Sequence, residues 1–167
     1  MSPNRLYIVF NIKRNKKEQI RMGFESFPSF SLMDDQENVR KLEDFRGRWL
    51  VVYFYPRDNT SGCTREARDF TSKLEEFHNL GAEVIGVSTQ STRSHRNFKE
   101  KHGLKHILLS DEKGRLAEKL GILKETGTAK RTTYLVDPKG NIVKIWKNVK
   151  VKGHADEVLE YLKKEKK

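Results

Sequence analysis

A chain of 167 residues has the length of a single domain and is long enough to bury one continuous hydrophobic core. Apolar residues make up 35% of it and charged residues 34%, a balance typical of soluble globular proteins, and no apolar run is long enough for a membrane span. Lys and Arg outnumber Asp and Glu by 34 to 23, and most of the excess lies at the two ends, with six basic residues against one acidic in 1–21 and seven against four in 147–167, whereas 22–146 is nearly neutral. Charge concentrated in the two ends argues against a DNA-binding domain, which usually shows a basic stripe on its folded body.

The chain is predicted to consist of two parts, a basic N-terminal extension over 1–21 and a folded domain over 22–167. The extension contains a short apolar run, 6–10, followed by a cluster of basic residues. This run is too short for a signal peptide, and no cleavage site follows it. Without a targeting signal we expect the cytoplasm, where a lone thiol stays reduced.

The first predicted element of the domain is a strand over 49–55, after an irregular stretch rich in Phe, Ser and Pro over 23–32. The strand is apolar throughout, as expected of a central strand that is buried on both faces. Pro56 ends it, and the loop 57–62 leads into a helix. Four apolar residues at helical spacing give this helix one buried stripe: Ala67, Phe70, Leu74 and Phe77.

Strands and helices then alternate before the chain ends in a hairpin and a helix. The predicted elements are a strand over 83–88, a helix over 92–102 ended by Gly103, a strand over 107–109, a helix around 116–120, strands over 132–136 and 142–146 joined by the turn 137–140, and a last helix with apolar residues at Ala155, Val158, Leu159 and Leu162. This order, a βαβ unit followed by ββα, predicts an α/β thioredoxin-like fold with a mixed central sheet flanked by helices.

Cys63, the chain's single cysteine, falls in the first turn of the predicted helix that follows the loop 57–62. Thr60 or Ser61 is suited to cap the start of this helix, and Gly81 to end it. Unpaired backbone N–H groups and the helix dipole favour a thiolate at such a position, and the thiolate is the reactive form of cysteine. The alternative is that Cys63 is simply a small buried apolar residue. One cysteine also excludes an intramolecular disulfide and a cysteine-rich zinc site.

Three residues of this region have a distinctive spacing, Pro56-x-x-x-Thr60-x-x-Cys63, and Arg131 opens the segment Arg-Thr-Thr-Tyr-Leu-Val-Asp downstream. With these motifs the chain resembles the peroxiredoxins of the alkyl hydroperoxide reductase and thiol-specific antioxidant superfamily. It closely resembles the peroxiredoxin Q group, whose members are also called bacterioferritin comigratory proteins. The resemblance extends from about residue 23 to the end of the chain and includes the segments 44–47, 84–88, 109–111, 131–137 and 149–154.

The resemblance implies a thiol peroxidase that reduces hydrogen peroxide and organic hydroperoxides without a metal or organic cofactor. Cys63 matches the peroxidatic cysteine, which becomes a sulfenic acid. Thr60 matches the hydroxyl that binds the peroxide and the thiolate, Arg131 the active-site arginine, and Pro56 the proline that shields the site from water. We therefore expect Cys63, Thr60 and Arg131 to bind the substrate.

Physical chemistry supports these roles but also allows simpler ones. Peroxide cleavage develops negative charge on the departing oxygen, so the rigid N–H groups of Arg131 would lower the barrier. Without Cys63 nearby, Arg131 would be an ordinary solvated residue at the start of a strand, and Thr60 a plain helix cap. Glu66 is a candidate for orienting Arg131, or a surface carboxylate favoured by the helix dipole.

Two positions depart from the family pattern. Ser61 stands where the group usually has proline, and Arg68 stands where many members carry the resolving cysteine. With no second cysteine, the chain is predicted to use a one-cysteine cycle in which an external thiol, from a thioredoxin-like protein or a small molecule, reduces the sulfenic acid. Family members are often monomers, so we expect a monomer or a weak homodimer.

The remaining features indicate no other chemistry. The five histidines show no metal-ligand pattern and are predicted to be structural or surface residues: His78, His95, His102, His106 and His154. The alternative function is a basic module that binds nucleic acid or a protein partner, with Cys63 incidental or a redox sensor. Nucleic acid is the less favoured partner, and we expect no contact with membranes.

Overall fold

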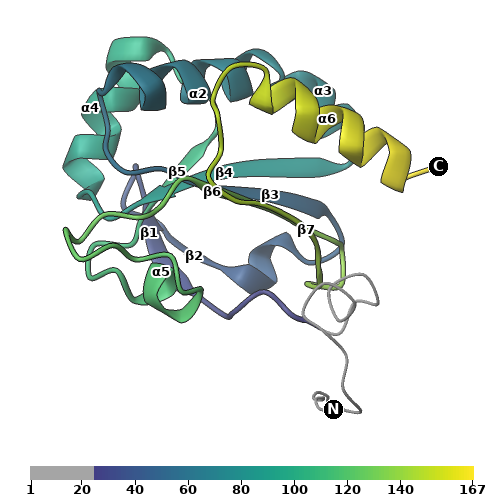
Figure 1. The fold of residues 1–167 in the computed structure, drawn as a ribbon, viewed down its shortest axis with the longest axis horizontal. Helices are drawn as coiled ribbons and strands as arrows, with labels where there is room; N and C mark the ends of the chain where they lie inside the picture. Colours follow the sequence, from purple (N-terminus) through teal and green to yellow (C-terminus); the bar gives the residue numbers. More distant parts are fainter. Residues whose placement is uncertain (1–24) are drawn as a thin grey trace.

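The computed structural model describes residues 25–167, so the predicted extension over 1–21 lies outside the described residues. Figure 1 shows a central sheet with helices on both sides. The strands are β1 (Ser31–Asp34), β2 (Val39–Lys41), β3 (Trp49–Phe54), β4 (Ala82–Ser88), β5 (Ile107–Ser110), β6 (Thr132–Val136) and β7 (Ile142–Trp146). The helices are η1 (Leu42–Phe45, a 3-10 helix), α2 (Ser61–Ser72), α3 (Leu74–Asn79), α4 (Thr92–His102), α5 (Arg115–Lys119) and α6 (His154–Glu165).

Over residues 25–167 the strands form one mixed sheet of seven, in the order β2-β1-β5-β4-β3-β6-β7. β3, β4 and β5 run parallel to one another, and β6 and β7 continue the sheet antiparallel on the other side of β3. The predicted bounds of β6 and β7 agree with the structure, and the turn between them closes through a hydrogen bond from Gly140 N to Asp137 O, 2.9 Å. The thioredoxin-like fold class predicted from the sequence is confirmed.

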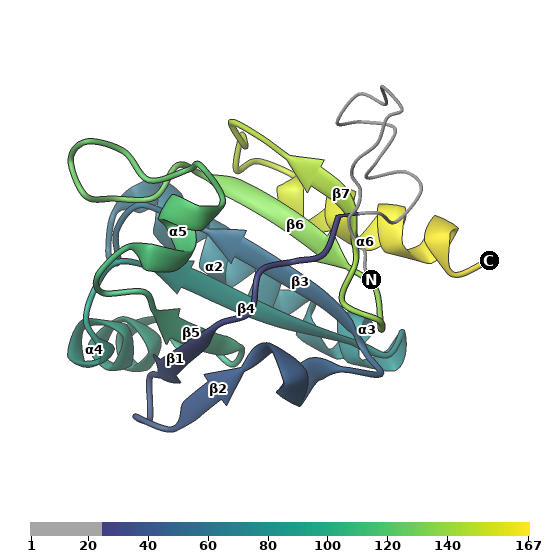
Figure 2. The ribbon, with the colours of Figure 1, turned by 90° about the horizontal axis from the view of Figure 1, so that it is seen from below.

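The sheet is covered on both faces, which explains why β3 is apolar throughout. Alternate residues of a strand point to opposite faces. Val51 and Tyr53 therefore belong to the core beneath α2, α4 and α6, whereas Val52 and Phe54 belong to the core on the side of η1 and α5. Figures 1 and 2 show α2, α3 and α6 together on one face, and α5 on the other. No helix in this part of the chain is both long and apolar enough to cross a membrane.

One predicted helix is two in the structure. The stripe that was predicted to lie on a single helix is buried, but the helix breaks at Lys73, between α2 and α3. The Ser72 hydroxyl donates to the Asp69 carbonyl at 2.8 Å, and Lys73 N donates to Phe70 O, three residues back, at 3.1 Å. Such short-range bonds compete with the α-helical pattern and explain the break.

The β1–β2 hairpin was not predicted, because its strands are short and lack a strong alternation of apolar and polar residues. β1 pairs with β2 and with β5, both antiparallel, so that β2 forms this edge of the sheet. The stretch before it, predicted to be irregular, is tied to the opposite side of the sheet. Phe27 N donates to Gly140 O and Ile142 N to Glu25 O, each at 2.9 Å.

Candidate active site

Cys63 is the third residue of α2, and the loop from Pro56 to Thr60 connects this helix to the end of β3. Thr60 is the helix N-cap in extended conformation, and the first intrahelical bond runs from Thr64 N to Thr60 O, 2.8 Å. The predicted place of Cys63 in the first helical turn is therefore confirmed. The cysteine is only 1% exposed.

Arg131 reaches Cys63 because of the strand pairing. In the β3–β6 register Phe54 lies opposite Thr132, so the residue before β6 lies beside the loop that follows β3. Arg131 Nη2 donates to the Cys63 sulfur at 3.2 Å, and Nη1 donates to Glu66 Oε1 at 2.6 Å. The guanidinium thus bridges the thiol and a carboxyl group from the next turn of α2.

Glu66 is almost completely buried, its side chain being 1% exposed. Burial raises the pKa of Glu66 to about 7, although the positive charge of Arg131 and its hydrogen bond act in the opposite direction. Burial lowers the pKa of Arg131, but Glu66 and Cys63 outweigh this and raise it above its usual value, so Arg131 stays a cation. Glu66 Oε2 is buried without a hydrogen-bond partner among the described residues. The contact that the sequence suggested between Glu66 and Arg131 is present.

Thr60 and Pro56 lie on the same loop, as predicted. Within residues 25–167, however, the Thr60 hydroxyl makes no hydrogen bond to the Cys63 sulfur. The Thr60 hydroxyl donates to the Arg57 carbonyl at 3.3 Å and accepts no hydrogen bond from the N–H groups at the start of α2, so Thr60 is the N-cap residue without a side-chain cap. Pro56 lies at a bend two residues after the end of β3 and is half-buried.

Sequence reasoning did not single out Asp58, in the middle of this loop. Its carboxylate is buried and accepts hydrogen bonds from Tyr55, Ser94 and His95. The helical spacing of His95 and Phe98 places His95 on the apolar face of α4, and this was the available signal for a buried histidine. No pattern in the sequence pairs it with an aspartate 37 residues earlier.

The other buried histidines have partners of a different kind. His106 lies between the hydroxyls of Tyr53 and Thr71, at 2.6 and 2.8 Å, and burial lowers its pKa to about 3. His154 contacts Thr133 and Glu157. Within the described part of the chain no three His, Cys, Asp or Glu side chains form a group suited to a metal ion.

Comparison with known proteins gives consistent results. The model of the AhpC/TSA family matches residues 25–145. Peroxiredoxin Bcp of Bacillus subtilis is 43% identical over 143 residues, covering 81% of this chain and 91% of its own. The chloroplastic peroxiredoxin Q of Populus jackii is 40% identical over 138 residues, covering 81% of this chain and 65% of its own.

Solved structures give the same result. A mutant of the Xylella fastidiosa PrxQ superposes with a TM-score of 0.80 at 38% identity, over 83% of this chain and 90% of that one. The bacterioferritin comigratory protein of Xanthomonas campestris, studied for its alkyl peroxide reduction activity, superposes with a TM-score of 0.79 at 39% identity, over 83% and 92%. The chain therefore belongs to the AhpC/TSA family and is a peroxiredoxin of the Bcp or Q type, a thiol-dependent peroxidase.

Proposed function

We propose that this protein reduces hydrogen peroxide and organic hydroperoxides through Cys63, with Thr60, Arg131 and Pro56 completing the site. The observation that supports this most directly is the hydrogen bond from Arg131 to the Cys63 sulfur, in the first turn of a helix. A fixed cation and the helix dipole both stabilise negative charge on the sulfur. The thiolate attacks one peroxide oxygen, the O–O bond breaks, and the released alkoxide or hydroxide takes up a proton to leave as alcohol or water. Cys63 is oxidised by two electrons to a sulfenic acid.

Each of the other three residues has a proposed part in this step. Arg131 stabilises the thiolate and the charge that develops on the departing oxygen. Thr60, released from its bond to the Arg57 carbonyl, donates to the peroxide. Pro56, at the bend before the loop, keeps water away from the sulfur. Glu66 positions Arg131 through the bond at 2.6 Å.

The second half of the cycle depends on a thiol from outside, because the chain has one cysteine. A first external thiol condenses with the sulfenic acid to a mixed disulfide and releases water, and a second thiol then releases the reduced Cys63 and a disulfide. We propose that a thioredoxin-like protein or a small thiol acts here, in the cytoplasm, on a monomer or weak homodimer. Cys63 is 1% exposed, so a bulky thiol reaches its sulfur only when the first turn of α2 opens.

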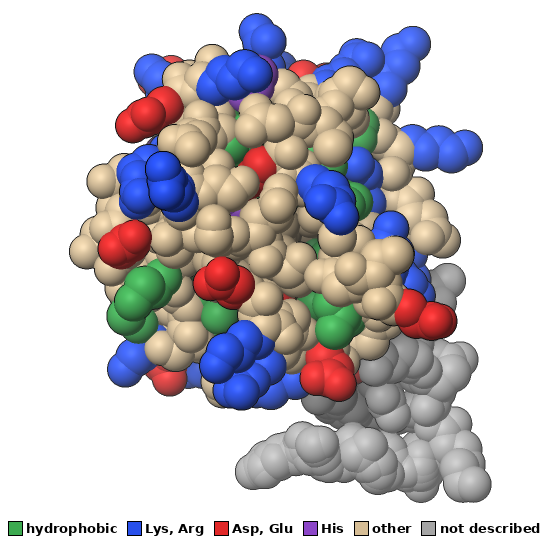
Figure 3. Space-filling view, turned by 90° about the vertical axis from the view of Figure 1, so that its left-hand side faces the viewer, with side chains coloured by type: hydrophobic (Ala, Val, Ile, Leu, Met, Phe, Trp, Pro, Cys, Tyr) green, Lys and Arg blue, Asp and Glu red, His purple; other side chains and the backbone are tan. Residues whose placement is uncertain are grey.

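The alternative of a basic binding module receives no support from the face shown in Figure 3. Lys and Arg side chains there are interspersed with Asp and Glu, and on this face the described residues show no basic stripe.

The decisive experiment compares wild type with Cys63→Ser for peroxide consumption in the presence of a thiol reductant. We expect turnover to be abolished while the thermal unfolding transition stays cooperative. Intact mass after one equivalent of peroxide, with candidate reductants added one at a time, identifies the oxidised species and the donor. A binding module would show no rate that depends on Cys63, and appreciable turnover by the serine variant would overturn the assignment.

A further inference from the structure

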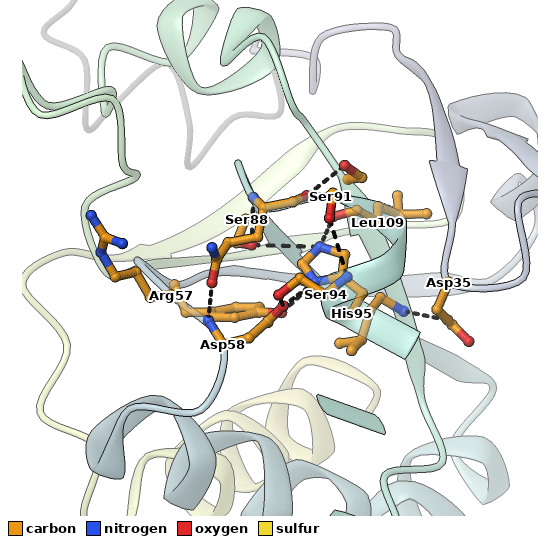
Figure 4. Close-up of polar contacts among 12 residues, drawn as sticks. Asp35, Arg57, Asp58, Ser88, Ser91, Ser94, His95 and Leu109 are labelled. Carbon is orange, nitrogen blue, oxygen red and sulfur yellow. Dashed lines mark hydrogen bonds and ion pairs between the residues drawn. The ribbon is translucent and has the colours of Figure 1, made fainter. Parts of the chain in front are cut away.

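A buried network of hydrogen bonds connects the loop between β3 and α2 to helix α4. Figure 4 shows Asp58 pointing from this loop toward Ser94 and His95. Asp58 Oδ1 accepts from the Tyr55 hydroxyl at 2.7 Å, and Oδ2 accepts from the Ser94 hydroxyl at 2.7 Å and contacts His95 Nδ1 at 2.8 Å. The side chains of His95 and Asp58 are 0% and 1% exposed, so this contact is shielded from water.

Asp58 is ionised in this network. Burial raises the pKa of Asp58, but the hydrogen bond and the charge of His95, together with the hydrogen bonds from Ser94 and Tyr55, outweigh burial and hold it below its usual value. The backbone of Asp58 is fixed as well, because its N–H donates to Gln90 Oε1 at 2.6 Å. Both carboxylate oxygens are therefore occupied by donors.

The second ring nitrogen of His95 also faces an acceptor. Nε2 lies 3.0 Å from the carbonyl oxygen of Leu109 in β5, whereas the Ser88 hydroxyl is farther away, at 3.5 Å. A carbonyl oxygen only accepts hydrogen bonds, and so does an ionised carboxylate. Both ring nitrogens of His95 therefore face an acceptor.

We propose that Asp58 and a doubly protonated His95 form a buried ion pair that positions the loop from Pro56 to Thr60 for the peroxidase reaction. Asp58 lies midway between the two loop residues to which the proposed function assigns roles, and the inference rests on that function. The next residue, Asn59, has a positive φ of 65° and accepts a hydrogen bond from His102 Nε2 at 3.2 Å, a second tie between the loop and α4.

The charges around His95 are consistent with this pairing. Asp58 and Tyr55 are the titratable groups in direct hydrogen-bond contact with the ring, and burial, together with Asp58, raises the pKa of Tyr55 well above its usual value, so Tyr55 stays neutral. Two cations of α4 instead contact Asp35: Arg96 donates to its backbone carbonyl and Lys99 to its carboxylate, each at 3.2 Å. Asp58 is therefore the counter-ion of His95.

The first test counts ring protons by nitrogen-detected NMR of the full chain at neutral pH. We expect both nitrogens of His95 to carry a proton, whereas His106 is the internal control with one, because burial lowers its pKa to about 3. In Asp58→Asn, the new amide N–H group faces Nδ1, so we expect His95 to keep a proton on Nε2 alone. The number of protons on the His95 ring is measured independently of peroxidase activity. A hydrogen bond between Asp58 and a neutral His95 would not give a ring with two N–H protons.

The second test measures the rate at which one equivalent of peroxide oxidises Cys63. We expect Asp58→Asn and His95→Gln to be slower by roughly 10- to 100-fold, the cost of a reacting group displaced by about 1 Å. His106→Gln is the matched control, a fully buried histidine with hydroxyl partners but no contact with the loop. It should lose stability and react at the rate of wild type. Should the two charge variants fail to fold, Ser94→Ala removes one donor to Asp58 and is expected to be slower by roughly three-fold or more.

Three outcomes would overturn the proposal: a single ring proton on His95 in wild type, an unchanged rate in the variants that fold, or an equal loss of rate in His106→Gln. Absence of any Cys63-dependent turnover in wild type would instead contradict the proposed function, while the NMR result would stand independently.

Discussion

Arg131 is the residue on which the proposed chemistry depends most, because it contacts the sulfur and the buried Glu66 at once. Arg131→Ala is expected to slow the oxidation of Cys63 by peroxide by roughly 10²-fold or more, the usual cost of losing a fixed donor to a developing oxyanion. Stopped-flow kinetics with one equivalent of peroxide measures this rate.

Arg131→Lys is the matched control for charge. Lysine keeps the positive charge but not the planar pair of N–H groups that holds sulfur and carboxylate together. An intermediate rate is therefore expected. A rate equal to wild type in Arg131→Ala would remove this residue from the site.

Glu66 makes the stability of the protein depend on pH in an identifiable direction. Its pKa is raised from 4.5 to about 7 on folding, so between these values the folded state binds more protons than the unfolded state. Glu66 therefore contributes about 3 kcal/mol to the free energy of unfolding below about pH 4.5. This contribution is lost as the pH rises through about 7. At lower pH, buried His106 changes the free energy of unfolding in the opposite direction, because burial lowers its pKa to about 3. Urea unfolding of wild type and Glu66→Gln should therefore be compared at each pH from 5 to 8. A constant difference between the two proteins would contradict the raised pKa.

The sequence indicated the residues that touch the sulfur better than those that support them. Cys63 and Arg131 were predictable because the motif around them is specific, and Glu66 because it lies one turn beyond Cys63 on the same helix. Two of the partners of Asp58, Ser94 and His95, lie 36 and 37 residues away on α4, and no local pattern encodes a contact of that range. Similarly, the β1–β2 hairpin depends on its pairing with β5, whereas the strongly apolar β3 and the β6–β7 hairpin with its Pro-Gly turn are encoded locally.

At the scale of elements, the wound first turn of α2 determines how Cys63 is regenerated. In a helix, Cα atoms five residues apart lie about 8–9 Å apart, whereas a disulfide needs about 4.4–6.8 Å. A cysteine at position 68 therefore bridges to Cys63 only if this turn unwinds, which breaks the bond from Thr64 N to Thr60 O. Position 68 is occupied by Arg68, which is exposed on α2 and has no thiol. Unwinding of this turn therefore cannot lead to an internal disulfide.

Two outcomes follow for the thiol chemistry of α2. The natural chain treated with peroxide should give a sulfenic acid, a mixed disulfide with added thiol or an intermolecular dimer, and excess peroxide should overoxidise it. Arg68→Cys should form an internal disulfide only slowly, as far as the turn opens, with Arg68→Ser as the control for the lost charge. Non-reducing gels and intact mass follow both. Fast and complete bridging would show that the helix start is not stiff, although the one-cysteine cycle of the natural chain would be unaffected.

At the scale of the whole molecule, everything assigned to the site lies between Pro56 and Arg131, far from the basic extension in the sequence. The first described residues contact the β6–β7 hairpin. Phe27 N donates to Gly140 O, and Ile142 N donates to Glu25 O. The Phe27 ring packs edge-on against the Tyr134 ring, with the centroids 5.4 Å apart. These contacts, all between described residues, hold the beginning of the domain to the β6–β7 hairpin.

We therefore expect a chain that starts at Met22 to keep the Cys63-dependent peroxidase activity of the full chain. The truncation removes six of the 34 basic residues and one of the 23 acidic ones, so the net charge falls from +11 to +6. Any retention on DNA should weaken with it and become less sensitive to salt, because fewer counterions are released. Peroxide consumption and thermal unfolding of the two chains, measured side by side, test the expectation. A truncated chain that unfolds cooperatively but has lost turnover would show that the extension contributes a residue to the site, and the boundary proposed at 21–22 would then be wrong.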